Sequence, residues 1–182
     1  ENTYSIKFKE GDILRFAVRA ETTSKLIIFA SNGRFYTLGV DKLPSSRGHG
    51  EPLRLMIDLP NNDEVVDMFL LETGRKFIVV SDTGRGFIVN EEDVVAQTKN
   101  GKQILNLKPD QKATKLVIIE QGHEHVAIIG SNRKLLIFPI NEIPIMARGS
   151  GVMMQRYTKG SVADLTTLKL REGLTWQTGA GV

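Results

Sequence analysis

The sequence predicts an all-β protein made of successive propeller-like blades, and three observations lead to this prediction. Segments with the same pattern recur at spacings of 51 and 49 residues. Each segment contains two apolar runs of strand length that are joined by a short polar turn, and further apolar runs follow it. The chain also lacks a long stretch with the periodicity of an amphipathic helix. Four strands in about 50 residues is the size of one propeller blade, and such repeats bury their faces against their neighbours.

Each repeat begins with a predicted β-hairpin. The three hairpins occupy residues 25–44, 76–95 and 125–144. The turns Asn32-Gly33 and Thr83-Gly84 favour a tight hairpin, because glycine adopts the positive φ that such a turn requires at little cost. The third turn has Asn132 without the glycine, and we expect Asn132 to adopt the same conformation there. Residues 91–97, at the end of the second hairpin, are predicted to form one or two helical turns.

A basic, glycine-containing loop follows each hairpin, and two further strands are expected after the loop. The loops are residues 45–52, 97–103 and 146–152. The expected strands are residues 53–59 and 65–72 in the first repeat, 104–108 and 114–120 in the second, and, with a weaker pattern, 152–157 and 161–170 in the third. Residues 4–20 resemble the second half of another repeat.

These repeats predict a single domain over residues 1–182. It would consist of a partial blade at 1–24, repeats at approximately 25–75, 76–122 and 123–173, and a C-terminal segment at 174–182. Because the chain begins at Glu1 rather than Met, we expect it to be a fragment of a longer protein.

The composition is that of an ordinary globular protein, with 41% hydrophobic and 25% charged residues. The absence of cysteine excludes disulfide bonds and thiolate metal sites. No apolar segment resembles a signal peptide or a membrane helix, so a cytoplasmic protein is expected. The net charge is +3, and residues 123–182 carry seven basic side chains against four acidic ones. This mild excess permits a polyanionic partner but does not require one.

The sequence contains no recognisable catalytic motif. His123 and His125 would share one face of a strand, but a metal site needs more ligands, and a solvated turn is favoured. Ser150 lacks the spacing of a hydrolase nucleophile, and Gly101-Lys102 lacks the other residues of a phosphate-binding P-loop. The acidic cluster at 91–93 is better explained as a solvated helix start than as a cation site. We therefore predict no catalytic residue, no metal site and no cofactor.

The basic loops give the strongest functional signal. Each places a basic residue beside a glycine, in Arg47-Gly48, Lys99-Asn100-Gly101 and Arg148-Gly149. Exposed backbone N–H groups beside a cationic side chain suit phosphate groups. A single loop of this kind is also explained by the need to turn between strands. Recurrence in successive repeats favours a long, regularly charged polymer as the ligand. His49 has no counterpart in the other loops and receives no chemical role.

The sequence resembles the C-terminal β-pinwheel domains of the A subunits of bacterial type IIA topoisomerases, and it is most similar to the topoisomerase IV branch. The resemblance rests on residues 32–60, 81–89, 93–107, 135–152 and 171–176, and it covers nearly the whole chain. The gyrase branch carries a Gln-Arg-Arg-Gly-Gly-Lys-Gly box for full DNA wrapping. The nearest loops here, residues 46–50 and 147–151, each have one arginine and no lysine. The resemblance therefore implies bending of DNA rather than tight chiral wrapping.

The resemblance also implies an accessory role in the chromosome. The domain would bind and bend double-stranded DNA without reading its sequence, and so steer DNA segments and set substrate preference in decatenation and relaxation. The active-site tyrosine domain would lie upstream, and ATP and Mg would belong to other domains. The implied partners are the ATPase B subunit and the catalytic region of the same polypeptide. The implied location is cytoplasmic and chromosome-associated, and peripheral membrane association of the full enzyme is allowed.

Charge and loop position identify the residues that we expect to contact DNA phosphates. The main candidates are Arg47, Arg54, Arg85, Lys99, Lys102, Arg148, Arg156 and Lys159, and the flanking candidates are Arg34, Arg133 and Lys134. An alternative function is a propeller-like platform for protein–protein interaction, which the modest net charge leaves open. An enzyme on a propeller scaffold is disfavoured, because no group of polar residues converges in the sequence pattern.

Overall fold

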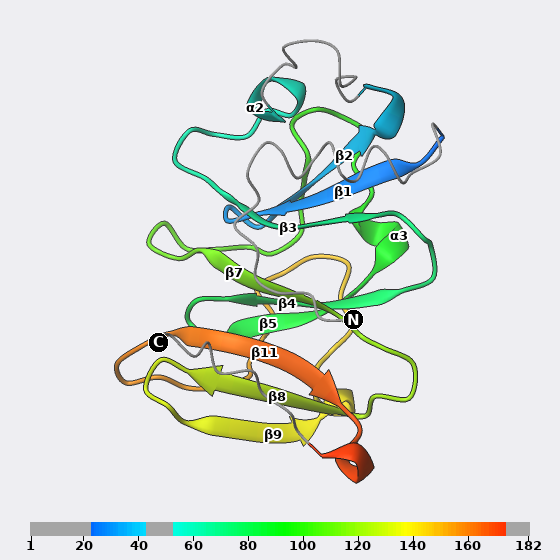
Figure 1. The fold of residues 1–182 in the computed structure, drawn as a ribbon. Helices are drawn as coiled ribbons and strands as arrows, with labels where there is room; N and C mark the ends of the chain where they lie inside the picture. The colour runs from blue at the N-terminus through cyan, green and yellow to red at the C-terminus, as the bar shows by residue number, and fades with distance from the viewer. Residues whose placement is uncertain (1–22, 43–52, 174–182) are drawn as a thin grey trace, which may run out of the picture.

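Three antiparallel β-sheets lie one above another and form three blades (Figure 1). The computed structural model describes residues 23–42 and 53–173. The first blade has the strand order β3 (Val65–Leu70), β1 (Lys25–Ala30), β2 (Arg34–Gly39) and β6 (Lys102–Gln103). The second has the order β7 (Ala113–Ile118), β4 (Lys76–Ser81), β5 (Arg85–Asn90) and β10 (Val152–Met153). The third has the order β11 (Val162–Leu168), β8 (His125–Gly130) and β9 (Leu135–Pro139). The predicted all-β, propeller-like fold is confirmed.

The three predicted hairpins are the centre of each blade. Strands β1 and β2, β4 and β5, and β8 and β9 pair in antiparallel fashion across short turns. Because neighbouring residues of a strand point to opposite faces, and because β1 and β4 are covered on both faces, these two strands are almost continuously apolar and buried. This is why the hairpins stand out in the sequence as apolar runs.

The outer strand of a blade comes from the next repeat. Strand β6 pairs with β2, and β10 pairs with β5, so a segment of the second repeat completes the first blade and a segment of the third completes the second. The prediction that residues 104–108 and 152–157 form strands of their own repeats is therefore wrong. The chain instead runs along the outer edge of the preceding blade and pairs with it over two residues at a time.

The prediction of a strand at residues 53–59 is also wrong. Residues Leu53–Met56 form the short helix α2. The backbone N–H of Ile57 donates to the carbonyl oxygen of Leu53, and Leu53, Met56 and Ile57 have the i, i+3, i+4 spacing of one helix face. This face packs with Tyr36 over the side of the first blade that no other described sheet covers. Helical spacing therefore overrides the apolar run that suggested a strand.

Short helices follow each hairpin at the same place. They are the 3-10 helix η1 (Val40–Lys42), the α-helix α3 (Glu91–Val94) and the 3-10 helix η2 (Ile140–Glu142). A further 3-10 helix, η3 (Leu170–Glu172), follows β11. The helical turn predicted at the end of the second hairpin is confirmed as α3.

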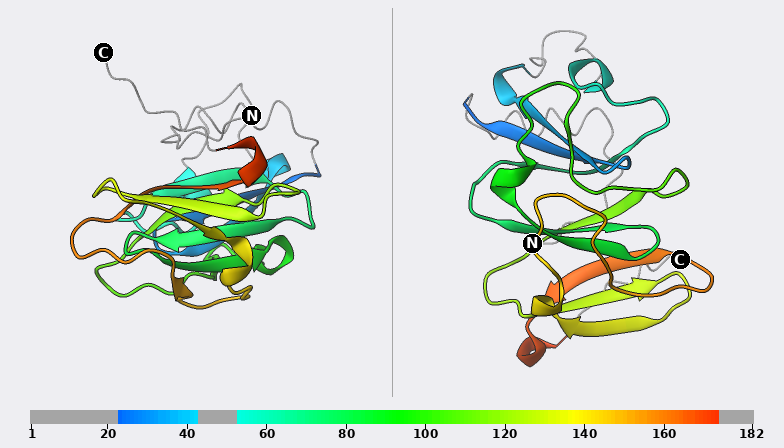
Figure 2. Two further views of the ribbon diagram at one scale, coloured as in Figure 1. Left: turned by 90° about the horizontal axis from the view of Figure 1, so that it is seen from below. Right: turned by 180° about the vertical axis from the view of Figure 1, so that it is seen from behind.

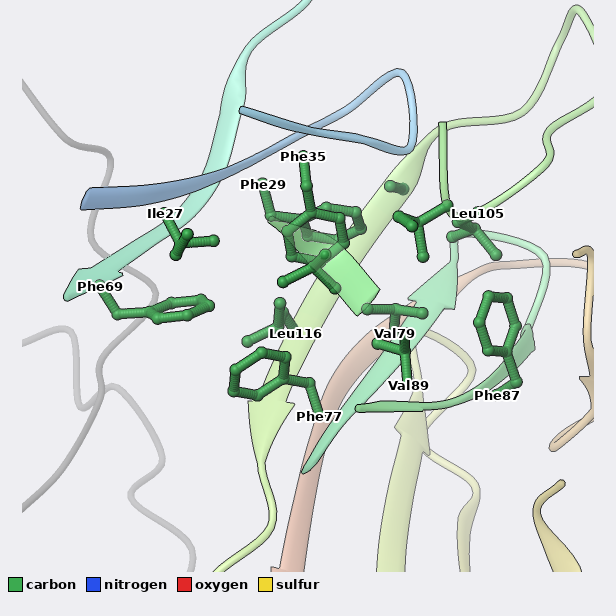
Figure 3. Close-up of a cluster of buried hydrophobic side chains, with 13 residues drawn as sticks. Ile27, Phe29, Phe35, Phe69, Phe77, Val79, Phe87, Val89, Leu105 and Leu116 are labelled. Carbon is green, nitrogen blue, oxygen red and sulfur yellow. The ribbon is translucent and has the colours of Figure 1, made fainter. Parts of the chain in front are cut away.

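The largest apolar cluster lies between the first and second blades (Figure 3). Phe29 and Phe35 of the first blade stack with their ring centroids 4.6 Å apart, and they face Val79 and Leu116 of the second. A second cluster joins the second and third blades through Ile78, Ile88, Val126 and Ile128, among others. Alternate residues of β4 thus serve two interfaces, so each blade depends on its neighbours for burial.

The inner strands β3, β7 and β11 lie next to one another in successive blades. Each has an irregularity at the same place, where one extra residue interrupts its pairing with β1, β4 or β8. A charged residue follows each irregularity, namely Asp67, Lys115 and Asp164. These three side chains alternate in sign along the line of inner strands, and the Lys115 ammonium lies 3.8 Å from the Asp164 carboxylate.

The hairpin turns differ in one residue. Gly33 and Gly84 have φ of 80° and 88°, as the sequence predicted, but in the third turn Arg133 adopts the positive φ, at 63°. The expectation that Asn132 would do so is wrong. Asn132 instead accepts a hydrogen bond from the N–H of Lys134 with its side-chain oxygen, as Asn32 does from Arg34, and so the asparagine keeps the same place in both turns.

Candidate nucleic-acid interface

Basic residues gather at one end of the three sheets. We call this the turn end: it contains the β1–β2, β4–β5 and β8–β9 turns, residues 54–64, and the connections 99–112 and 148–161. Its segments at 57–64, 108–112 and 157–161 lie on the left of Figure 1. The described basic residues there are Arg34, Arg54, Arg85, Lys99, Lys102, Lys108, Lys112, Arg133, Lys134, Arg148, Arg156 and Lys159. The described acidic ones are Asp58, Asp63, Glu64, Asp82 and Asp110.

The opposite end of the sheets has the reverse balance. It contains α3 and η3, on the right of Figure 1. The basic residues described there are Lys25, Lys42, Arg75, Lys76, Lys169 and Arg171, and the acidic ones are Asp41, Glu72, Glu91, Glu92, Asp93, Glu120, Glu124, Glu142 and Glu172. The charge of the described residues is therefore separated along the strand direction, which the small net charge of +3 conceals.

Two predicted arginines occupy equivalent positions at the start of a second hairpin strand. Arg34 begins β2 and donates from Nη1 to the carbonyl oxygen of Asn100 at 3.1 Å. Arg85 begins β5 and donates from Nη1 to the carbonyl oxygen of Gly151 at 3.2 Å. Donor and acceptor are 66 positions apart in both cases. Each arginine thus holds the exchanged segment, and its remaining side-chain N–H groups have no other partner among the described residues.

The exchanged segments correct the sequence alignment of the basic loops. Gly101 and Gly151 occupy equivalent positions, because they have φ of 72° and 70° and approach the equivalent carbonyl groups of Phe35 and Gly86. Lys99 lies two residues before its glycine, whereas Arg148 lies three before. The basic residue therefore does not recur at one position, and these two glycines serve the approach of the chain to its own neighbouring strand rather than to a ligand.

Lys99, Lys102 and Arg148 are all exposed. The ammonium of Lys102 donates to the carbonyl oxygen of Asp93 at 2.7 Å and so points back along the blade. The connections that carry these residues pass over the outer edges of the sheets, and they face the viewer in the right panel of Figure 2. Lys99 and Arg148 have no described side-chain hydrogen bond or ion pair, so within the described part of the chain they are free to bind an anion.

The side chain of Arg54 makes hydrogen bonds within the protein. Its two terminal nitrogens donate to the carbonyl oxygens of Pro60 and Asp63, both at 2.8 Å, so its guanidinium holds the turn after α2. It is nevertheless exposed, at the same end as the other candidates. Arg47, like His49, lies outside the described residues.

The third hairpin turn and the connection before β11 bring four predicted residues to the turn end. Arg133 and Lys134 lie in the turn itself, and Arg156 and Lys159 lie in the connection. The two segments are joined because Gln155 donates to the carbonyl oxygen of Lys134 and the N–H of Ser161 donates to the hydroxyl of Ser131. All four basic side chains are exposed. They add four exposed cations to the turn end.

The acidic cluster does start helix α3, as the sequence predicted, and Glu92 is exposed, but the prediction of a solvated carboxylate is wrong for Glu91. Glu91 is fully buried. Burial by itself raises the pKa of this carboxyl, but hydrogen bonds from the Arg75 side chain and from the backbone N–H groups of Glu72 and Arg75 outweigh burial and hold the pKa below its usual value. The Arg75 guanidinium also lies over the rings of Phe69 and Phe77. Glu91 is therefore a structural ion pair and not a cation site.

The two histidines are less solvated than expected. His123 Nδ1 lies 2.7 Å from the hydroxyl of Thr167, and its Nε2 lies 3.4 Å from the Glu120 carboxylate. His125 has a buried Nδ1 without a hydrogen-bond partner among the described residues. In the described part of the chain, no group of three or more His, Asp or Glu residues could hold a metal ion. Over residues 23–42 and 53–173, no helix is long and apolar enough to cross a membrane.

Three comparisons place the chain among known proteins. The family model described as "DNA gyrase C-terminal domain, beta-propeller" matches residues 24–72, 75–120 and 124–170. The A subunit of DNA topoisomerase 4 from Caulobacter vibrioides is 48% identical over 97% of this chain and 23% of that protein. Its counterpart from Escherichia coli K12 is 30% identical over 80% of this chain and 19% of that protein. The chain thus spans about a quarter or less of the length of these relatives.

Solved structures show the same fold. The C-terminal domain of Escherichia coli ParC superimposes with a TM-score of 0.75 at 27% identity, over 82% of this chain and 64% of that chain. The C-terminal domain of DNA gyrase A superimposes with a TM-score of 0.62 at 15% identity, over 82% of this chain and 50% of that chain. The stacked blades therefore belong to a known fold.

Proposed function

Because the chain belongs to the family of DNA gyrase C-terminal domains with a β-propeller fold, we propose that it is a DNA-binding accessory domain of a type IIA topoisomerase. The observation that carries this proposal is the separation of charge between the two ends of the blades. The turn end has twelve described basic residues against five acidic ones, as named above, although Lys102 directs its ammonium away from this end, and the opposite end has more acidic than basic residues. Duplex DNA would lie across the turn end.

The chemistry of this end suits phosphate groups rather than base edges. Its cations are long side chains on turns and connections, exposed except for the partly exposed Arg34, and the one described helix at this end, α2, is only four residues long. Arginine and lysine at such positions neutralise phosphates and fix the path of the duplex without reading its sequence. Because equivalent turns follow one another from blade to blade, a duplex that crosses one turn is led to the next.

The domain would act on DNA by bending it. Contacts on successive blades would hold a transported segment or bend the flanks of the gate segment, and so set the preference for linked or supercoiled DNA. The relatives, which are A subunits of DNA topoisomerase 4, lead us to propose two partners in a cytoplasmic, chromosome-associated enzyme: the catalytic region of the same polypeptide and the ATPase B subunit. DNA cleavage and its cofactors, ATP and Mg, would belong to other domains, and we assign no catalytic residue to this one.

Two triple variants test the location of the interface. The turn-end variant is Lys99→Ala, Arg148→Ala and Lys159→Ala, and the matched control at the opposite end is Lys25→Ala, Lys42→Ala and Lys76→Ala. All six side chains are exposed, and none has a described hydrogen bond or ion pair. Both variants lose three positive charges. Binding to a duplex of random sequence is measured by fluorescence anisotropy as a function of salt concentration.

The wild-type chain should bind with an affinity that falls steeply with salt, by a slope of about −0.9 per phosphate neutralised. The turn-end variant should lower the magnitude of this slope by about 2 to 3 and weaken binding at low salt at least tenfold. The control should keep most of the slope. Equal losses in both variants would show that net charge rather than the turn end governs binding, and a wild-type slope near zero would refute DNA binding itself.

A further inference from the structure

The exchanged outer strand depends on the glycine of each hairpin turn. In the first blade, the carbonyl oxygen of Gly33 accepts hydrogen bonds from the N–H groups of Ile104 and Leu105, at 3.2 and 3.1 Å. In the second blade, the carbonyl oxygen of Gly84 accepts one from the N–H of Met154 at 2.8 Å. The incoming segment therefore docks on the turn itself as well as on the edge of β2 or β5.

The docked segment leaves no room for a side chain at this glycine. A Cβ atom at Gly33 would lie well inside contact distance of the carbonyl oxygen of Leu105, and a Cβ at Gly84 would do the same with that of Gln155. Both obstacles are backbone atoms, which a rotamer change cannot move. A turn that receives an exchanged strand must therefore have glycine here, for space as well as for its positive φ.

The third turn breaks this rule. Its equivalent residue is Arg133, which adopts a positive φ of 63° although residues other than glycine seldom do. Strand β9, which follows this turn, pairs with β8 and with no other strand in the described part of the chain. Leu135, Leu136 and Ile137 are 48%, 41% and 39% exposed there, whereas the residues of β5 before Asn90 are buried except for Arg85.

We propose that Arg133 makes the third blade a terminal blade, because its Cβ occupies the space through which an exchanged strand would have to pass. The unpaired edge of β9 then cannot accept a segment like those that complete the other two blades. This holds whether the segment belongs to a further repeat or to a second copy of the chain. The block acts on strand exchange alone, because the face of the sheet, with Leu135 and Ile137, stays apolar. This block would act whether or not the chain binds DNA.

A chain with an added repeat tests this block directly. Residues 122–173 are repeated once after residue 173, so that the second copy can offer its 148–155 segment to β9 of the first copy. Three versions are compared: the unchanged one, Arg133→Gly in the first copy, and Lys134→Gly in the first copy. The Lys134→Gly version is the matched control for Arg133→Gly, because it also replaces one exposed basic residue of the turn by glycine.

The readout is amide hydrogen exchange at Leu135 and Ile137 of the first copy, followed by NMR with only that copy labelled. These positions correspond to Gly86 and Ile88, and the N–H of Ile88 donates to the carbonyl oxygen of Pro144 in the completed second blade. Protection of Ile128 in the central strand β8 reports that the third blade is folded in every version.

Exchange at Ile137 should be at least tenfold slower in the Arg133→Gly version than in the other two. Equal protection in the unchanged version would overturn the proposal, because Arg133 would then admit the strand. A lack of protection in the Arg133→Gly version would overturn it as well, because the edge would then be closed by something other than this side chain.

Discussion

Arg75 and Glu91 form the most enclosed ion pair among the described residues. Glu91 is fully buried and Arg75 is 20% exposed, and their closest atoms, Arg75 Nη2 and Glu91 Oε1, are 2.8 Å apart. The guanidinium also donates to the carbonyl oxygen of Leu70 in the first blade, whereas Glu91 belongs to the second. One arginine thus ties two blades together. Its repeat equivalents do not carry the same pair, so no repeat pattern could have predicted it.

Arg75→Ala should destabilise the molecule strongly, because it leaves the Glu91 carboxylate buried without its partner. Breaking a buried ion pair by removal of one member costs about 3–5 kcal/mol. Since the pKa of Glu91 is lowered in the folded state, the wild-type pair stabilises the fold above the ordinary carboxyl pKa and loses this effect as the pH falls through the lowered one. The difference between variant and wild type in urea unfolding should therefore shrink in acid.

Glu72→Ala serves as the control for this experiment. Glu72 also contacts Arg75, at 3.4 Å, but its side chain is 69% exposed. An exposed ion pair contributes at most about 1 kcal/mol, so this variant should unfold close to the wild-type midpoint. If the two variants were equally stable, the buried pair would not be the link between the blades.

The two exchanged-strand glycines show what sequence can and cannot reveal about single residues. A basic residue beside a glycine marks residues 97–103 and 146–152 in the sequence, and both segments do lie at the turn end. The glycines, however, pack on carbonyl groups of the preceding blade. Sequence spacing alone could not distinguish a glycine that faces a ligand from one that faces another strand, because both require close approach of the backbone.

At the scale of elements, the exchanged strands β6 and β10 hold successive blades together. Each is only two residues long, so its pairing contributes little by itself. Each exchanged strand is held in place by the buried residues that follow it, Ile104, Leu105 and Met154. The close approach of Gly101 or Gly151 to a carbonyl group of the preceding blade also holds it. The hairpins could be predicted from apolar runs and turn residues. The exchanged strands could not, because a two-residue strand has no periodicity of its own.

Gly101→Ala should release β6 from the first blade. An added Cβ would lie 2.7 Å from the carbonyl oxygen of Phe35, in addition to the strain of an alanine at a φ of 72°. We expect a loss of about 2–4 kcal/mol in unfolding free energy, because strain and overpacking each cost about 1–3 kcal/mol. The measurement is urea unfolding, with proteolysis of residues 96–108 as a local readout.

Gly74→Ala separates the two contributions. Gly74 has a similar φ of 82°, but an added Cβ there would meet nothing within 4 Å. This variant should lose only about 1 kcal/mol, from backbone strain. If both variants lost the same stability, close packing of the exchanged strand would be unimportant.

At the scale of the whole molecule, a line of alternating charges runs along the inner strands. Burial raises the pKa of Asp67 to about 6, although a hydrogen bond from the N–H of Met68 and the charge of Lys115 act in the opposite direction. Lys115 also pairs with Asp164. One lysine of the second blade thus interacts with an aspartate on each neighbouring blade.

Asp67→Asn should change how stability depends on pH. The folded pKa of about 6 lies above the usual value of about 4, so the ionised form of Asp67 is disfavoured in the folded state. The wild-type chain should gain stability relative to the variant as the pH falls from 8 through 6. At pH 8 the variant should be more stable by about 1–2 kcal/mol, because its amide keeps an acceptor for the N–H of Met68 without a buried charge. Urea unfolding at pH 5, 6.5 and 8 measures this difference.

Asp164→Asn is the matched control, because Asp164 accepts the equivalent hydrogen bond from Leu165 but is 46% exposed. Because its carboxylate is partly exposed, its replacement should change the unfolding midpoint at pH 8 less than Asp67→Asn does. An Asp67→Asn variant that was less stable than wild type at pH 8 would show that attraction to Lys115 outweighs burial.

The repeat spacing and the strand-length apolar runs predicted the overall architecture well, because stacked blades need the same apolar pattern in every repeat. The separation of charge between the two ends was not visible in the sequence. Residues close together along the chain, such as Lys112 and Glu120, can lie at opposite ends of one strand. A count of charges along the sequence therefore does not separate the two ends. The cations lie together at the turn end because the strands pair in antiparallel fashion.

The exchange of outer strands also delays the completion of each blade during synthesis of the chain. Strand β2 is made early, but the residues of β6 that pair with it follow 67 and 69 positions later, and those of β10 follow their partners in β5 by 66 and 68 positions. At about 5–20 residues per second, each edge waits roughly 3 to 13 seconds on the ribosome for its own strand. During this interval the edge can pair with the same segment of a neighbouring nascent chain. We therefore expect slower translation to give each unpaired edge more time to meet the matching segment of another copy.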